Sequence, residues 1–140
     1  KTYNLLELPY IWANSNSSLA SQNPIAVLLS EEKSINNNNS IRCTLPENVN
    51  RSDGNYIFIT TNSSAKNPIT MQLTYGKNTS ISGSFLFTIP SENTTDKKFA
   101  IRISTQFNWY AIKNNWIKLE TLNADSNVIK IKKIALLKGD

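Results

Sequence analysis

Apolar and polar side chains alternate with a period of two along much of the chain. Met71, Leu73 and Tyr75 fall on one side of such an alternation, and Gln72 and Thr74 fall on the other. Because successive side chains of a β-strand point to opposite faces, this pattern predicts a strand with one buried face. The same alternation recurs at residues 85–89, 99–104, 116–120 and 129–132, and strand-like apolar runs occupy residues 24–30 and 56–60.

Polar turn clusters separate these segments. They are rich in Asn, Ser, Thr, Asp or Gly and lie at residues 36–40, 48–54, 62–67, 76–80, 91–98 and 123–127. Asn tolerates the left-handed backbone conformation, which suits it to the turns of a chain with only four glycines. Many short strands without intervening helices predict an all-β fold, namely an antiparallel, jelly-roll-like β-sandwich of seven to nine strands.

The length of 140 residues fits one domain, so residues 1–140 are predicted to form a single β-sandwich. The chain starts at Lys1 without a methionine, and we expect it to be excised from a larger cell-envelope or secreted protein. Near its start, Pro9 interrupts an apolar stretch. This proline favours an edge strand, or an extended segment packed on the sandwich.

The charge and the apolar runs of the chain restrict its partners, and its cysteine content bears on the core. Fifteen basic and ten acidic residues give a net charge of +5, an excess that favours anionic partners. The densest basic stretch, residues 130–138, alternates lysines with Ile and Leu as the solvated face of a strand does, so we expect no nucleic-acid partner. No run of about 18 apolar residues occurs, so we expect no direct membrane insertion by this fragment. Cys43 is the single cysteine and is expected to be a small buried apolar side chain.

Several kinds of catalytic machinery are missing from the sequence. The chain has no histidine, which excludes Ser-His-Asp and Cys-His catalysis and nearly every common zinc site. It also has no Gly-rich phosphate loop and no nucleophile elbow. Asp53, Asp96 and Asp125 lie in predicted turns, but no cluster of acids accompanies them. We therefore expect no enzymatic activity, no cofactor and no metal, with a structural Ca²⁺ left as an alternative.

Aromatic and amide side chains are mixed at residues 106–110 and 114–116. Sugar rings stack on aromatic faces and their hydroxyls bond to planar amides, so this composition suits carbohydrate. If Ile117 and Leu119 face the core, Trp116 lies on the outer face of its strand. The predicted ligand-binding residues are Trp116, Tyr110, Asn108, Gln106, Asn115 and Arg102.

Alternatives remain for several of these residues. Trp116 would instead cover a sheet edge or pack beneath the N-terminal segment. Trp109 is expected to point into the core, whereas Tyr110 points outward if the alternation of residues 99–104 continues. Arg102 would bind a carboxylate or phosphate of a charged glycan, or else form a surface ion pair.

The second half of the chain resembles the β-sandwich carbohydrate-binding modules. The stretches that carry the resemblance are NYIFI at 55–59, MQLTYG at 71–76, NWIKL at 115–119 and VIKIKKIALLKGD at 128–140. Many such modules similarly have a tryptophan opening a late strand, here Trp116, and an apolar final strand. This chain lacks the acid-rich final strand that often accompanies structural calcium in them. The resemblance implies an accessory module attached to a glycosidase, a glycosyltransferase or a transporter of surface polysaccharide.

Together these features predict a non-catalytic polysaccharide- or oligosaccharide-binding module of a larger glycan-processing or glycan-exporting protein. We expect it to be bacterial and extracytoplasmic, at the cell surface or secreted, and monomeric as an isolated domain. The alternative is a structural or interaction domain, such as an adhesin module or an extracytoplasmic domain of a membrane glycosyltransferase. That alternative predicts Trp116 buried against Tyr10 or Trp12. An opposed pair of carboxylates in a cleft would instead indicate a small hydrolase.

Overall fold

The computed structural model describes residues 10–13, 24–47, 54, 56–91, 93–106, 108–109, 113–124 and 128–138. These residues form ten strands and one turn of 3₁₀ helix, η3 (Ile103–Thr105), and they contain no α-helix. The strands are β1 (Tyr10–Ala13), β2 (Ala26–Leu29), β3 (Lys33–Ile35), β4 (Ser40–Thr44), β5 (Tyr56–Ser63), β6 (Ile69–Lys77), β7 (Ser80–Ile89), β8 (Asn93–Ile101), β9 (Trp116–Thr121) and β10 (Ile129–Leu137).

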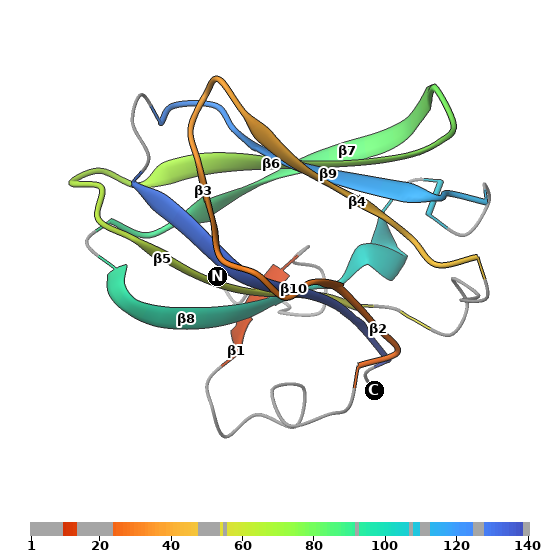
Figure 1. Ribbon diagram of the computed structural model, residues 1–140, viewed down its shortest axis with the longest axis horizontal. Coiled ribbons are helices and arrows are strands. Elements are labelled where there is room, and N and C mark those ends of the chain that lie inside the picture. Colours follow the sequence, from red (N-terminus) through yellow and green to blue (C-terminus); the bar gives the residue numbers. More distant parts are fainter. Residues whose placement is uncertain are drawn as a thin grey trace, which may run out of the picture.

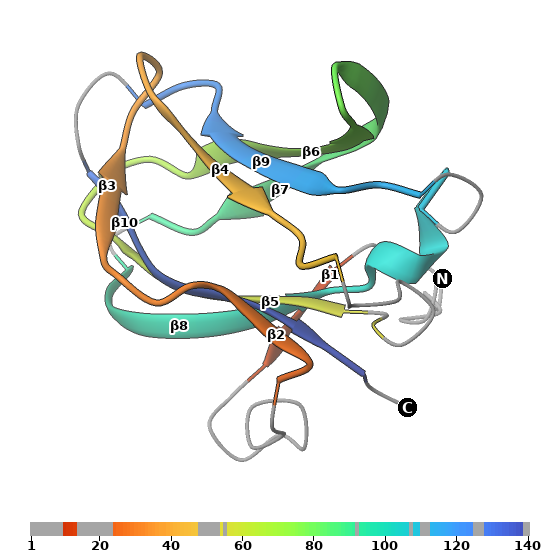
Figure 2. The same cartoon turned by 45° about the vertical axis from the view of Figure 1, so that its right-hand side comes forward.

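Two antiparallel sheets form two layers, which are separated in both Figure 1 and Figure 2. The six-stranded sheet has the order β1-β8-β5-β10-β2, with β3 also paired to β10. The four-stranded sheet has the order β4-β9-β6-β7. The prediction of an all-β antiparallel sandwich is therefore confirmed.

The strand order is that of a jelly roll with one added edge strand. β2 and β3 follow one another along the same side of β10: Leu29 lies opposite Ile134, and Ile35 lies opposite Ile129. Taken as one broken strand, they give the order β2/β3-β10-β5-β8 facing β4-β9-β6-β7. β1 is added beside β8, so Tyr10–Ala13 has the edge position that Pro9 favoured. The structure has more than the expected seven to nine strands because two short strands that were not predicted, β3 and β4, lie on either side of the turn cluster predicted at residues 36–40.

The main core lies between the sheets, where the inward residues of both layers meet. The predicted alternation is confirmed: Met71, Leu73 and Tyr75 are buried, as are Ile117 and Leu119. Trp109 is fully buried, as expected, and its ring meets that of Tyr75 edge-on with centroids 5.6 Å apart. Cys43 is buried in the same cluster, and this burial raises the pKa of its thiol against the opposing effect of Lys33.

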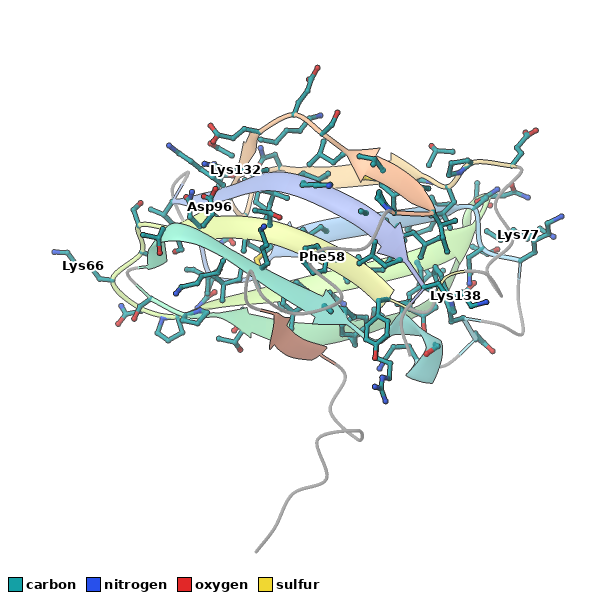
Figure 3. All side chains as sticks on the ribbon, turned by 90° about the horizontal axis from the view of Figure 1, so that it is seen from below. Phe58, Lys66, Lys77, Asp96, Lys132 and Lys138 are labelled. Carbon is teal, nitrogen blue, oxygen red and sulfur yellow. The ribbon has the colours of Figure 1, made fainter. Side chains whose placement is uncertain are left out.

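The outer face of the six-stranded sheet carries a second apolar cluster, around Phe58 in the middle of the sheet (Figure 3). Phe58 lies opposite Ala100 on β8 and opposite Ala135 on β10. All members of the cluster are buried: Tyr56, Phe58, Ala100, Ala135 and Leu137. The middle of this sheet is therefore buried on both faces, which explains why residues 56–60 form an unbroken apolar run instead of an alternation.

Asparagine side chains shape the connection between β3 and β4, which passes from one sheet to the other. The Asn36 Oδ1 accepts the backbone N–H of Asn38 at 2.8 Å, and the Asn39 Oδ1 accepts that of Asn36 at 2.7 Å. Asn78 has a φ of 55° in the β6–β7 turn. This is the left-handed conformation that asparagine tolerates better than most residues. No helix in the described residues is long and apolar enough to cross a membrane.

Candidate functional site

The outer face of the four-stranded sheet is polar. Its side chains alternate with the core residues of β4, β9, β6 and β7, so every second residue of each strand lies on the outer face, where most are exposed or half-buried. Trp116 and Thr74 also lie on this face but are buried. In one row across the sheet, Arg42 lies opposite Lys118, which lies opposite Thr74, which lies opposite Ser84. In the next row, the residues in strand order are Ser40, Glu120, Gln72 and Leu86.

Trp116 lies on this outer face, as its phase predicted, but only 5% of its surface is exposed. Gly76 on the neighbouring strand makes room for the ring, because a Cβ there would collide with the indole and with the Ser80 carbonyl. The indole N–H donates to the Asn78 carbonyl at 2.8 Å. The packing partners expected in the alternative, Tyr10 and Trp12, are on β1 of the other sheet.

Arg42 covers the remaining face of Trp116. Its guanidinium carbon lies 4.2 Å from the centroid of the indole ring, at the distance of a cation–π contact. Arg42 is itself exposed and makes no ion pair with any acid that the structure describes. A guanidinium stacked on a ring keeps its N–H donors in the plane of the stack, where they remain available to a carboxylate or a phosphate.

A second cation lies beside Arg42. Arg42 and Lys118 are directly opposite one another on adjacent strands, where like charges destabilise a sheet. Lys118 is balanced in part by Glu120, with 3.7 Å between the Lys118 Nζ and the Glu120 Oε1. The two rows together therefore carry two positive charges and one negative charge beside an aromatic ring.

The side-chain amide of Asn115, a predicted site residue, forms hydrogen bonds that hold the β6–β7 turn. Its Nδ2 donates to the Asn78 Oδ1 at 3.0 Å, and its Oδ1 accepts the Asn78 backbone N–H at 3.0 Å. With the bond from the Trp116 indole, three hydrogen bonds fasten this turn to the start of β9. Asn115 is thus placed beside Trp116, as predicted, but its amide is bonded internally.

The other predicted amides lie in the loop that follows η3. Asn108, with a φ of 63°, donates from its Nδ2 to the Ser82 carbonyl on β7 at 3.2 Å. The backbone carbonyl of Gln106 accepts the Trp109 N–H at 3.2 Å. Asn114, which was not predicted as a site residue, is buried and donates to the carbonyls of Asn108 and Trp109 at 3.2 Å each. The β6–β7 hairpin thus gathers Asn108, Asn115 and Trp116 at one end of the sandwich.

Arg102 lies apart from these residues. Its Nε and one Nη donate to the hydroxyl of Tyr56 at 3.0 and 2.7 Å, and its guanidinium carbon is 5.4 Å from the Tyr56 ring centroid. Tyr56 belongs to the outer cluster of the six-stranded sheet, so Arg102 does not join the polar face of the other sheet. Tyr110 lies outside the described residues.

The described residues give no support to a metal centre. They contain no group of three or more His, Cys, Asp or Glu side chains that would hold an ion. Asp96 instead accepts a hydrogen bond from the Asn62 Nδ2 at 2.9 Å, and its Oδ1 is 3.0 Å from the Lys132 Nζ. Asp53 and Asp125, the other two acids considered for calcium, lie outside the described residues.

Arg42 was not among the predicted site residues. It was missed because residues 36–40 were interpreted as a loop and no strand was predicted after them. The signal was nevertheless present: Ile41, Cys43 and Leu45 alternate with Arg42 and Thr44. An alternation of five residues was overlooked beside the longer ones.

The polar outer face of the four-stranded sheet, with Arg42 stacked on Trp116, is the candidate site. It offers hydroxyl, amide, ammonium and guanidinium groups in register, whereas the apolar cluster on the outer face of the six-stranded sheet is buried. No family model, curated protein or solved structure matches the chain. We therefore infer what this face binds from its side chains and their geometry alone.

Proposed function

We propose that this domain is a non-catalytic module that binds an acidic polysaccharide on the outer face of its four-stranded sheet. The observation that carries the proposal is the stack of Arg42 on Trp116, next to Lys118 and without an acidic partner among the described residues. A carboxylate on a sugar ring would relieve the repulsion between these two cations, and Arg binds carboxylates with two parallel hydrogen bonds.

The neighbouring side chains support a sugar ligand. Ser84, in the row of Arg42 and Lys118, and Gln72, in the next row, add hydroxyl and amide groups toward β7, and the Gln72 Nε2 donates to the Ser84 Oγ at 3.2 Å. Hydroxyl-rich ligands require such donors and acceptors in a fixed array. A sheet provides that array, because residues opposite one another on adjacent strands stay about 5 Å apart.

The absence of catalysis is part of the proposal. Glycoside hydrolysis needs a carboxylic acid whose pKa is raised so that it can donate a proton. The pKa of Asp96 is lowered instead, first by the hydrogen bond from Asn62 and then by Lys132. Glu120, the described acid on the candidate face, forms an ion pair with Lys118. Such a module would serve a larger bacterial glycan-processing or glycan-exporting protein, outside the cytoplasm.

Calorimetric titration with polyuronates and with neutral polysaccharides tests the proposal. We expect the polyuronates to bind and the affinity to fall as salt is added, because ion pairs at an exposed site are screened. Arg42→Ala should weaken binding at least tenfold, which corresponds to about 1.4 kcal/mol. Lys66→Ala is the matched control, because it also removes one positive charge. Lys66 lies at the end of the sandwich opposite Lys77, which follows Gly76 beside Trp116 (Figure 3). The control variant should leave the affinity unchanged.

Two outcomes would reject this proposal. One is the failure of every polyuronate to bind the wild-type domain at millimolar concentration. The other is an equal loss of affinity in Arg42→Ala and Lys66→Ala, which would indicate non-specific attraction to a basic domain instead of a site at Arg42.

A structural or interaction domain is the second candidate, favoured by the internal bonding of the predicted site. Trp116 is nearly buried, and the amides of Asn78 and Asn115 bond to each other. The tryptophan emission spectrum, recorded with and without polysaccharide, separates the two candidates. If Trp116 contributes to the ligand face, a bound polysaccharide should shift its emission. An emission spectrum that no polysaccharide alters would favour the interaction domain.

A further inference from the structure

β7 forms a long edge of the four-stranded sheet. Among the strands that the structure describes, β6 is its only partner, so the other side of its ten-residue backbone has no strand beside it. The sequence of β7, SISGSFLFTI, contains no charged residue and no proline. Two of its apolar side chains are largely exposed, Ile81 at 68% and Leu86 at 53%.

The other edges carry features that discourage pairing with a further strand. β1 is four residues long and follows Pro9. The β2/β3 edge is interrupted at residues 30–32, where Glu31 and Glu32 are exposed. β4 is five residues long and has the exposed Arg42 at its centre. Short, broken or charged edges, and edges flanked by proline, are the usual means by which sheets avoid pairing with other chains. β7 shares only the flanking proline, Pro90, which lies outside the strand; the strand itself is long, uncharged and free of proline.

One end of β7 is already occupied. The Asn108 side chain donates to the Ser82 carbonyl, and the register with β6 shifts between Tyr75 and Gly76, opposite this point. The segment left for a new partner is therefore residues 83–89, and its midpoint is Leu86.

We propose that β7 pairs with β7 of a second copy of this chain, antiparallel and about a two-fold axis at Leu86. Residues opposite one another across antiparallel strands must point to the same face, and this register satisfies that condition. Leu86 then lies opposite the partner's Leu86, and Ser84 lies opposite the partner's Thr88. On the inner face, the half-buried Phe85 lies opposite the partner's Phe87.

A second copy suits this edge because the edge is self-complementary. A two-fold axis brings each residue of residues 83–89 against the same segment of the partner, so any charge there would face a like charge or lie near one. The chain has a net charge of +5, yet this segment has none. The pairing also covers both Leu86 side chains and the exposed part of Phe85, and it makes one continuous eight-stranded sheet.

The association is weak. A contact confined to one seven-residue strand is expected to bury less than the roughly 1,200 Å² found in stable complexes, so we expect the dimer to form only at high protein concentration. The monomer expected from the sequence is then the state at low micromolar concentration. Added salt strengthens the pairing, because it screens the repulsion between two domains of like net charge.

Sedimentation velocity over a range from low micromolar to millimolar concentration tests this inference on the wild-type chain. We expect a reversible monomer–dimer equilibrium. Hydrogen exchange measured at the two ends of this range should show amides of residues 83–89 exchanging several-fold more slowly at the high concentration, because backbone pairing protects them.

Leu86→Lys places two ammonium groups opposite each other at the axis and should abolish the dimer. Ile81→Lys is the matched control: it makes the same change of charge at an exposed apolar residue of the same strand, outside residues 83–89. It should leave the dissociation constant within about twofold. A wild-type chain that stays monomeric at millimolar concentration would overturn the inference. So would equal weakening by the two variants, or a dimer that forms without protecting residues 83–89.

Discussion

Trp116 illustrates how a residue's face and its exposure are separate questions. The alternation with Ile117 and Leu119 places it on the outer face, and that prediction is correct. Its burial depends on two residues far away in sequence: Gly76, which leaves space beneath the ring, and Arg42, which lies over it. Neither residue carries a local signal that connects it with Trp116, so sequence reasoning could predict the orientation of this side chain but not its surroundings.

At the residue scale, Gly76→Ala tests whether the glycine is needed for the indole. The added Cβ would collide with the Trp116 ring and with the Ser80 carbonyl. Because overpacking in a filled site costs about 1–3 kcal/mol, we expect the free energy of unfolding in urea to fall by that amount. The indole should also be displaced, which would shift tryptophan emission to longer wavelength.

A double-mutant cycle with Trp116→Ala shows whether the Trp116 ring or the Ser80 carbonyl excludes a side chain at residue 76. If the ring is the obstacle, Gly76→Ala should cost clearly less in the Trp116→Ala background than in the wild type. An equal cost in both backgrounds would show that the Ser80 carbonyl alone requires glycine at residue 76.

At the scale of elements, strands with a visible alternation were predicted well, whereas the turn predicted at residues 91–98 is wrong because β8 (Asn93–Ile101) occupies most of it. β6 and β7 have nine and ten residues, and their alternation is visible without any knowledge of their partners. β3 has three residues and adjoins a run of four asparagines, so residues 33–40 resemble a loop. β3 is a strand only because it pairs with β10, more than 90 residues later. Such pairing is a property of the fold and leaves no pattern within the segment itself.

The run of asparagines that hid β3 also connects the two sheets. The Asn37 Oδ1 accepts the Thr121 hydroxyl at 2.9 Å and the Ala124 backbone N–H at 2.8 Å. Thr121 and Ala124 are both buried. The carbonyl oxygen of one exposed asparagine therefore satisfies two donors at the end of β9, and it ties the β3–β4 connection to the four-stranded sheet.

Asn37→Ala should destabilise the domain more than its exposed position suggests. The substitution leaves a buried hydroxyl and a buried N–H without their acceptor, at a cost of about 1–3 kcal/mol in the free energy of unfolding. Asn38→Ala is the control, because the described bond of Asn38 is made by its backbone N–H and not by its side chain. It should change stability by less than about 0.5 kcal/mol. Equal effects of the two substitutions in urea denaturation would contradict this role of Asn37.

At the scale of the whole molecule, the two outer faces of the sandwich differ in a way that the sequence suggested only in part. The unbroken apolar run at residues 56–60 predicted a strand. In the structure, Tyr56 and Phe58 point outward and are nevertheless buried, while Ile57 and Ile59 fill the core. The four-stranded sheet keeps a clean alternation and an open polar face. The candidate site was predicted mainly at residues 106–116, whereas the available charges, those of Arg42 and Lys118, lie on this face.

The absence of histidine should make the stability of the whole molecule insensitive to pH between about 5.5 and 7. Carboxyl groups ordinarily titrate near pH 4 and lysines near 10.4, so no side chain of ordinary pKa changes its charge in this interval. Below it, Asp96 contributes to acid sensitivity. The Asn62 hydrogen bond and Lys132 lower its pKa in the folded state, and Figure 3 shows Asp96 beside Lys132.

A pKa that is lower in the folded state than in the unfolded chain stabilises the fold above the unfolded value, about 3.9, and this contribution is lost as the pH falls through the folded value. The Asp96 side chain is 42% exposed, so its ion pair with Lys132 contributes at most about 1 kcal/mol. In urea denaturation at a series of pH values, Asp96→Asn should therefore lower stability by up to this amount at pH 6. The difference from the wild type should shrink as the pH falls below 4. A difference between the variant and the wild type that persists unchanged at pH 2 would contradict this role of Asp96. A change of wild-type stability near pH 6.5 would contradict the expected insensitivity to pH.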